Sequence, residues 1–153
     1  MSLNLCGLFS KVKYGIFEST IKDLDFVCLC ETKTKHIPPS EFEDFHIFTP
    51  NKTNNSDLAI LANKRNNLFL KLIENTKSGH IIWLGVGNNN NFEFIIGSVY
   101  IPCEKSLEQT ELLFEEISND ILYLKTKFDL PTYFYGRFQL PNWNRSRLYR
   151  FSK

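Results

Sequence analysis

The sequence predicts an α+β fold in which short β-strands predominate and two helices interrupt them. Short apolar runs separated by polar breaks recur along most of the 153 residues, which is typical of strands. Two longer segments instead carry apolar residues at helical spacing. A hydrophobic fraction of 42% with 14% aromatic residues supports a globular core, because disordered chains have few aromatic residues. The length suits one domain.

The first half of the chain predicts a strand, a helix and then several further strands. The first strand is expected at residues 3–8, and the helix at about residues 12–24. Phe26–Cys30 is a continuous apolar run, as expected of a strand that is covered on both faces. The remaining strands of this half are expected at residues 45–48, 58–62 and 68–73.

The second half predicts an antiparallel pair of strands and, near the end, one more strand. The pair covers residues 80–86 and 92–101, and the turn between them is rich in glycine and asparagine, which tolerate positive φ angles. The last strand, at residues 132–135, is expected to be buried and to stop at Gly136.

A long amphipathic helix is expected between these strands, at about residues 106–127. Ser106 can cap its first turn, and the acidic Glu108 and Glu111 suit the positive end of the helix dipole. One apolar stripe should face the core. Its expected members are Leu107, Leu113, Phe114, Ile117, Ile121 and Leu124.

The cysteines predict reduced thiols in an intracellular protein, either nuclear or cytoplasmic. Cys6, Cys28, Cys30 and Cys103 have neither the spacing of a zinc site nor that of a redox motif. Buried thiols are the better interpretation, and Cys28 and Cys30 would share one face of a strand. The chain begins without a basic and apolar leader, and no apolar run is long enough to span a bilayer, so no membrane association is expected.

The charge is balanced overall but uneven along the chain. The formal net charge is +1, whereas no acidic residue follows Asp129. We therefore expect a basic C-terminal tail at residues 141–153, distinct from a domain at residues 1–140. Such a tail could bind the phosphate backbone of DNA, and the alternative is a solvated tail without a partner. The candidate phosphate-binding residues are Arg145, Arg147 and Arg150.

Four segments, taken in order, carry a resemblance to a known family. They are Leu-Asn-Leu-Cys-Gly-Leu at residues 3–8, Phe-Val-Cys-Leu-Cys-Glu-Thr-Lys at 26–33, Gly-Ser-Val-Tyr-Ile-Pro at 97–102 and Tyr-Gly-Arg-Phe-Gln at 135–139. Their order and spacing resemble the AP-endonuclease-like endonuclease/exonuclease/phosphatase domain of non-LTR retrotransposon proteins of the LINE and jockey type. The resemblance implies a layered β-sandwich flanked by helices, here the N-terminal portion, truncated at the C-terminus.

The resemblance also implies a metal-dependent phosphodiesterase that acts on DNA. Phosphodiester hydrolysis needs a divalent cation and a water poised for in-line attack, and Mg²⁺ prefers hard oxygen ligands. By resemblance, Asn4 and Glu31 hold or orient the metal, and the hydroxyl of Tyr100 contacts the scissile phosphate. Without the resemblance, Glu31 would be a solvated strand end and Tyr100 a packing aromatic.

The fourth segment departs from the family's Gly-Asp-Phe-Asn. Arg137 stands where the family has the aspartate that orients or deprotonates the water, and a guanidinium cannot act as a base. Gln139 replaces the family's phosphate-binding asparagine, and the closing Asp-His pair is absent before Lys153. Whether the chain is an enzyme is therefore open. We expect an impaired endonuclease, and the alternative is a non-catalytic remnant that binds nucleic acid or protein weakly.

Two further expectations follow from the resemblance. Mg²⁺ should bind only weakly, and a partner or a missing C-terminal segment should cover the exposed face of the sheet. An unrelated β-rich binding domain is a third hypothesis, but it leaves the order of the four segments unexplained.

Overall fold

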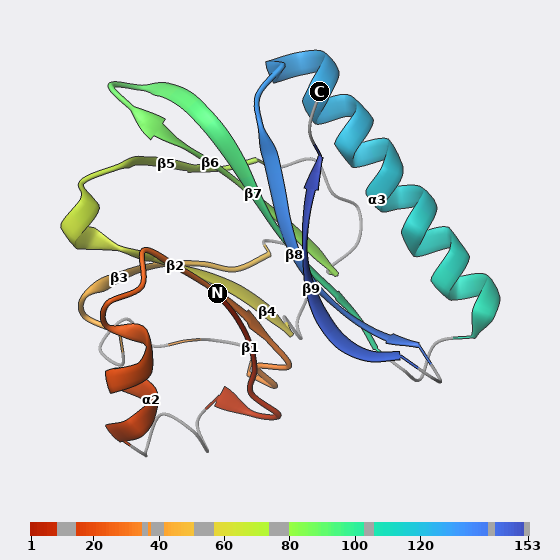
Figure 1. The fold of residues 1–153 in the computed structure, drawn as a ribbon, viewed down its shortest axis with the longest axis horizontal. Helices are drawn as coiled ribbons and strands as arrows, with labels where there is room; N and C mark the ends of the chain where they lie inside the picture. The colour runs from red at the N-terminus through yellow and green to blue at the C-terminus, as the bar shows by residue number, and fades with distance from the viewer. Residues whose placement is uncertain are drawn as a thin grey trace.

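Two β-sheets pack face to face between two helices, α2 (Gly15–Ile21) and α3 (Leu107–Phe128) (Figure 1). This computed structural model describes residues 1–8, 15–34, 37, 42–50, 57–73, 80–102, 106–140 and 143–151. One apolar cluster joins α2 to the four-stranded sheet, a second lies between the sheets, and a third joins the five-stranded sheet to α3. The α+β class and the helix-flanked sandwich expected from the sequence are confirmed.

The four-stranded sheet consists of β1 (Ser2–Asn4), β2 (Phe26–Cys30), β4 (Leu58–Asn63) and β3 (Phe45–Phe48), in that spatial order. β1 is parallel to β2, whereas β4 is antiparallel to both β2 and β3. Every residue of β4 is buried, and so is β2 after its first residue. Burial on both faces explains why these two strands have almost no polar residues.

The five-stranded sheet has the spatial order β5-β6-β7-β8-β9. All neighbouring pairs are antiparallel except β7 and β8, which are parallel and are connected through α3. The strands are β5 (Phe69–Leu72), β6 (Ile81–Asn88), β7 (Asn91–Ile101), β8 (Thr132–Leu140) and β9 (Trp143–Phe151).

The predicted hairpin is present as β6 and β7. Its turn residues Asn89 and Asn90 have φ angles of 50° and 67°, the left-handed conformation that asparagine tolerates. Further along β7, Gly97 is required by close packing, because a Cβ there would lie 2.2 Å from the Trp83 ring. The conformation of the hairpin is therefore determined by its turn residues and by the close packing of the Trp83 ring against Gly97.

The α3 helix begins with a capping box, in which Ser106 and Gln109 each accept a hydrogen bond from the other's backbone N–H. The predicted stripe is partly wrong: Leu107 and Phe114 are 74% and 40% exposed. Asp120 lies on the buried face instead, where its carboxylate accepts a hydrogen bond from the indole N–H of Trp83 at 2.9 Å. In the part of the chain that the structure describes, no helix is long and apolar enough to cross a membrane.

The C-terminal part of the chain differs from the expectation. The strand predicted to stop at Gly136 continues as β8 to Leu140, because each of these residues pairs with β9. The basic segment at residues 141–153 contains β9, so its backbone from Trp143 to Phe151 belongs to the sheet. The first strand is shorter than predicted, since the left-handed backbone at Cys6 (φ 46°) ends its regular pairing.

The cysteines follow the prediction only in part. Cys28 and Cys30 are buried and lie on one face of β2, within the cluster between the sheets. Cys6 is exposed, because it lies beyond the end of β1. Cys103 lies outside the described residues.

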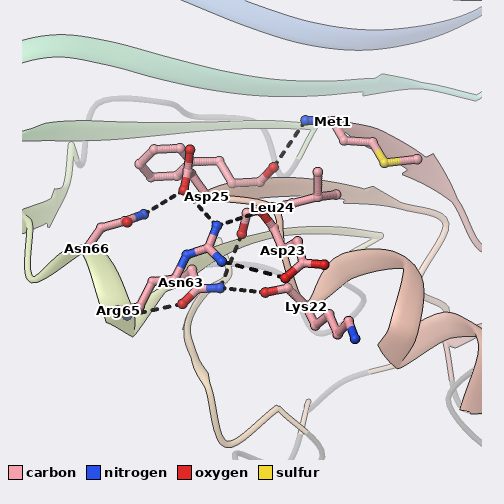
Figure 2. Close-up of polar contacts among 9 residues, drawn as sticks. Met1, Lys22, Asp23, Leu24, Asp25, Asn63, Arg65 and Asn66 are labelled. Carbon is pink, nitrogen blue, oxygen red and sulfur yellow. Dashed lines mark hydrogen bonds and ion pairs between the residues drawn. The ribbon is translucent and has the colours of Figure 1, made fainter.

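A polar network fastens the turn after α2 to the turn after β4 (Figure 2). The side-chain amide of Asn63 donates hydrogen bonds to the carbonyl oxygens of Lys22 at 3.0 Å and Leu24 at 3.3 Å. Its oxygen accepts a hydrogen bond from the backbone N–H of Arg65. Asn63 thereby caps the start of the short 3₁₀ helix η2 (Lys64–Asn66). Buried Asn63 thus satisfies backbone groups that the turn would otherwise leave without partners.

Arg65 extends the network to the surface. Its guanidinium lies 3.2 Å from the Asp25 carboxylate and 3.8 Å from that of Asp23. Hydrogen bonds from Asn66, and then from Arg65, hold the pKa of Asp25 below its usual value. The network lies where β2 begins and β4 ends, so it closes the end of the sheet opposite the functional residues described next.

Candidate metal and phosphate site

Asn4 and Glu31 lie at the same end of two neighbouring parallel strands. The Cα atom of Asn4 pairs with that of Cys30, and Glu31 follows directly as β2 ends. The pairing continues past both strands, because the backbone N–H of Leu5 donates to the Cys30 carbonyl at 3.0 Å and that of Gly7 to the Glu31 carbonyl at 2.8 Å. The parallel pair therefore brings the two predicted metal-binding positions to one end of the sheet.

The backbone at this end is unusually strained. Cys6, Glu31 and Lys33 have φ angles of 46°, 57° and 50°, and Gly7 has 108°. Left-handed backbone costs roughly 1–2 kcal/mol for a non-glycine residue. Such residues persist where the surrounding structure holds them, and they cluster at functional sites.

The Glu31 side chain is 7% exposed, and one of its carboxylate oxygens accepts a hydrogen bond from the Cys6 thiol at 3.2 Å. Sequence reasoning missed Cys6 as a site residue. The signal available in the sequence was the position of Cys6, two residues after Asn4. Because Asn4 pairs with Cys30 in the parallel sheet, Cys6 lies beside Glu31, the residue after Cys30.

Tyr100 reaches the same end from the other sheet. The Phe26 and Phe94 rings meet edge to face at 6.3 Å, and the Cys28 thiol faces the Ser98 hydroxyl further along both strands. These two contacts show that β2 and β7 run in the same direction across the sandwich. Tyr100, near the end of β7, is buried in the cluster that also holds Cys30.

The interior behind this end is neutral. Burial, with a smaller effect of Cys30, raises the pKa of the Cys28 thiol to about 12. Burial also raises the pKa of the Tyr135 hydroxyl. The Ser98 hydroxyl oxygen, although it faces Cys28, has no well-formed hydrogen bond to any residue that the structure describes. These three hydroxyl and thiol groups therefore bring no charge to the interior behind Glu31.

Arg137 occupies the position beside Tyr100 on the neighbouring strand. The two residues are direct partners in the parallel β7–β8 pairing, so their backbones lie side by side at the same end of the sandwich. A permanent positive charge thus stands at the position where the resemblance expects an aspartate.

The three arginines predicted to bind nucleic acid, Arg145, Arg147 and Arg150, all belong to β9, the edge strand of the five-stranded sheet. Their binding of phosphate stays a prediction.

The donor set at this end fits Mg²⁺ in kind, since a carboxylate at Glu31 and an amide at Asn4 are hard oxygen ligands. It is small: within the described ranges, no three histidine, cysteine, aspartate or glutamate side chains lie close enough to hold a metal. Mg²⁺ commonly uses one or two carboxylates and fills its other positions with water and substrate phosphate. Glu31 and Asn4 would therefore suit a weak Mg²⁺ site whose remaining ligands are water and substrate phosphate.

Three solved structures share this arrangement of sheets and helices. The endonuclease domain of TRAS1, a telomere-specific non-LTR retrotransposon, matches 88% of this chain with a TM-score of 0.63 and 16% identity. An AP endonuclease from Archaeoglobus fulgidus matches 88% with a TM-score of 0.62 and 15% identity. The human Nocturnin catalytic domain matches 84% with a TM-score of 0.57 and 14% identity.

The chain therefore shares the fold of these nuclease structures. The resemblance drawn from the four sequence segments is thereby confirmed at the level of the fold. The chain spans 57%, 55% and 56% of the lengths of the three structures. No protein-family model matches the sequence, and no curated protein matches it significantly.

Proposed function

We propose that the chain is a metal-binding phosphodiesterase domain of the DNA-endonuclease type whose hydrolytic activity is impaired. The observation that carries this proposal is the convergence of Asn4, Glu31 and Tyr100 at one end of the sandwich. The shared fold of two endonucleases supports it. The buried thiols of Cys28 and Cys30 agree with an intracellular location, in the nucleus or the cytoplasm.

Each residue would have a distinct task. Glu31 and Asn4 would supply oxygen ligands to Mg²⁺, which when bound neutralises charge that develops on a phosphate oxygen. The Tyr100 hydroxyl would donate a hydrogen bond to the phosphate and help to fix its orientation. Because Tyr100 is buried and its strand lies in the middle of the five-stranded sheet, this donor would need little reorganisation.

The proposed impairment of hydrolysis follows from the arginine at position 137. A general base must accept a proton at the working pH, and a guanidinium does not. The positive charge would also oppose a cation at the end of the sandwich where Glu31 lies. Binding of the metal is therefore expected to be weak, and activation of a water molecule to be lost.

The test is the binding of Mn²⁺, a spectroscopic substitute for Mg²⁺, measured by electron paramagnetic resonance. We expect one weak site that Mg²⁺ displaces. Glu31→Gln should weaken binding by at least about tenfold, because it removes the charged ligand and keeps the side-chain shape. Glu111→Gln, the same change at an exposed position of α3, should have no effect. Equal affinities in the wild type and Glu31→Gln would refute the metal site.

The position of Arg137 also favours a second candidate, a non-catalytic domain that binds nucleic acid or protein. A partner or a further segment of chain would then pair with β9, the edge strand of the five-stranded sheet. Arg145, Arg147 and Arg150 would contribute phosphate contacts. Fluorescence anisotropy with duplex DNA should show weak binding that falls steeply with salt. Binding that is absent even at low salt would remove DNA as the partner.

A further inference from the structure

The outer surface of α3 carries large apolar side chains that the fold leaves uncovered. Leu107, Phe114 and Leu122 are 74%, 40% and 65% exposed. The helix lies at the outside of the molecule, beyond the five-stranded sheet (Figure 1). Apolar groups that gather on one exposed face of a helix often mark an interface with another protein.

A symmetric row of exposed residues runs along this face of α3. Successive members are three, four, four and three residues apart, which is the spacing by which one helix packs against another. An α-helix turns about 100° per residue, so all five members lie within an arc of about 80°. We call this row the α3 seam. Its members are Glu111, Phe114, Ser118, Leu122 and Lys125.

The charges of α3 are separated by sign along the helix. Its first fourteen residues, 107–120, contain five acidic residues and no basic residue, whereas residues 121–128 contain two lysines and no acidic residue. Two such helices in antiparallel orientation place the acidic half of each beside the basic half of the other. A parallel pair would instead oppose like charges, which is unfavourable.

We propose that the α3 seam binds the same seam of a second copy of this chain, in antiparallel orientation, to form a two-fold symmetric dimer. The symmetric spacing places Ser118 on the two-fold axis, where a small side chain lets the helices approach closely. Phe114 of each copy then packs against Leu122 of the other. Glu111 of each copy likewise faces Lys125 of the other. The inference does not depend on the proposed metal site.

The dimer should be weak and dependent on concentration, because one pair of helices buries less surface than a standard stable interface. Sedimentation equilibrium measures the association. Glu111→Lys and Lys125→Glu each oppose like charges at both symmetric positions. Each variant alone should therefore self-associate at least about fivefold more weakly than the wild type. Glu43→Lys, the same charge change at an exposed position next to the other sheet, should have no effect.

Mixing the two seam variants gives the sharpest test. In a mixed dimer, every substituted side chain faces an opposite charge at both symmetric positions. The mixture should therefore associate within about threefold of the wild type, although neither variant does so alone. Circular dichroism checks that each variant is folded.

Three outcomes would overturn the inference. A wild type that stays monomeric even at millimolar concentration would show that α3 does not bind a second copy, and would leave its face to a different protein or to a further segment of chain. Self-association that neither seam variant weakens would place the interface elsewhere. Weakened association that mixing does not restore would rule out the antiparallel pairing of Glu111 with Lys125.

Discussion

Asp120 lies on the buried face of α3, and its carboxylate accepts the hydrogen bond of the Trp83 indole. Burial raises the pKa of this carboxyl, although the bond from Trp83 lowers it in part. A raised pKa in the folded state means that ionisation of Asp120 costs stability. The stability that the protonated Asp120 carboxyl gives to the fold is fully present below the pKa of this group in the unfolded chain. That stability is lost as pH rises through the pKa of the folded state.

We predict that Asp120→Asn will become more stable relative to the wild type as pH rises from acidic to neutral. An asparagine oxygen can still accept the indole hydrogen bond but carries no charge. Asp120→Ala should be about 1–3 kcal/mol less stable than Asp120→Asn at every pH, because the buried indole N–H is left without its acceptor. Urea unfolding at several pH values measures both. A constant difference between wild type and Asp120→Asn would contradict the assignment.

Arg137 is the residue on which the proposed impairment rests. We predict that Arg137→Asp will strengthen Mn²⁺ binding by roughly three- to tenfold, since it replaces a positive charge near the site with a negative one. Arg145→Asp makes the same charge change on β9, the edge strand of the sheet, and should have a smaller effect. Equal effects of the two variants would show that Arg137 does not act on the metal-binding end.

At the scale of elements, the network between α2 and β4 offers a test of which polar contacts matter. Asn63 is buried and bonds to two carbonyl oxygens, whereas Arg65 pairs with aspartates at the surface. We predict that Asn63→Ala will cost about 1–3 kcal/mol and Arg65→Ala no more than about 1 kcal/mol. Denaturant unfolding gives both values. The reverse order would mean that the surface ion pairs hold this turn.

The sequence predicted the elements best where periodicity and turn chemistry agree. The bounds of β2 and β3 match the expectation, and the Asn89–Asn90 turn forms as expected. Periodicity failed on α3, where one side of the apolar stripe is exposed and Asp120 is buried. Apolar spacing alone cannot reveal that Trp83 on a distant strand supplies a hydrogen-bond donor.

For the site, the sequence predicted positions but not contacts. Alternation along a strand gives the face of Cys28 and Cys30, and the resemblance gives Asn4, Glu31 and Tyr100. The thiol of Cys6 meets Glu31 only because β1 and β2 are parallel and both leave the sheet through left-handed backbone. The pairing of β9 with β8 likewise could not be predicted, because a basic composition does not specify a strand.

At the scale of the whole molecule, the sandwich brings the ends of β1, β2, β7 and β8 together. A phosphodiesterase would need its metal-binding, phosphate-binding and water-activating groups to meet at this end. The chain spans 57% of the TRAS1 endonuclease domain with which it shares its fold. The central claim is that this end can still hold a cation but cannot activate water, because Arg137 replaces the acid–base group.

The most direct measurement is nicking of supercoiled plasmid by the purified chain with Mg²⁺. Loss of one acid–base group typically costs ~10²–10⁴-fold in rate, so we predict nicking no faster than in the Glu31→Gln control. Mg²⁺-dependent nicking by the wild type that Glu31→Gln abolishes would contradict the claim, because it would show a complete hydrolytic site despite Arg137.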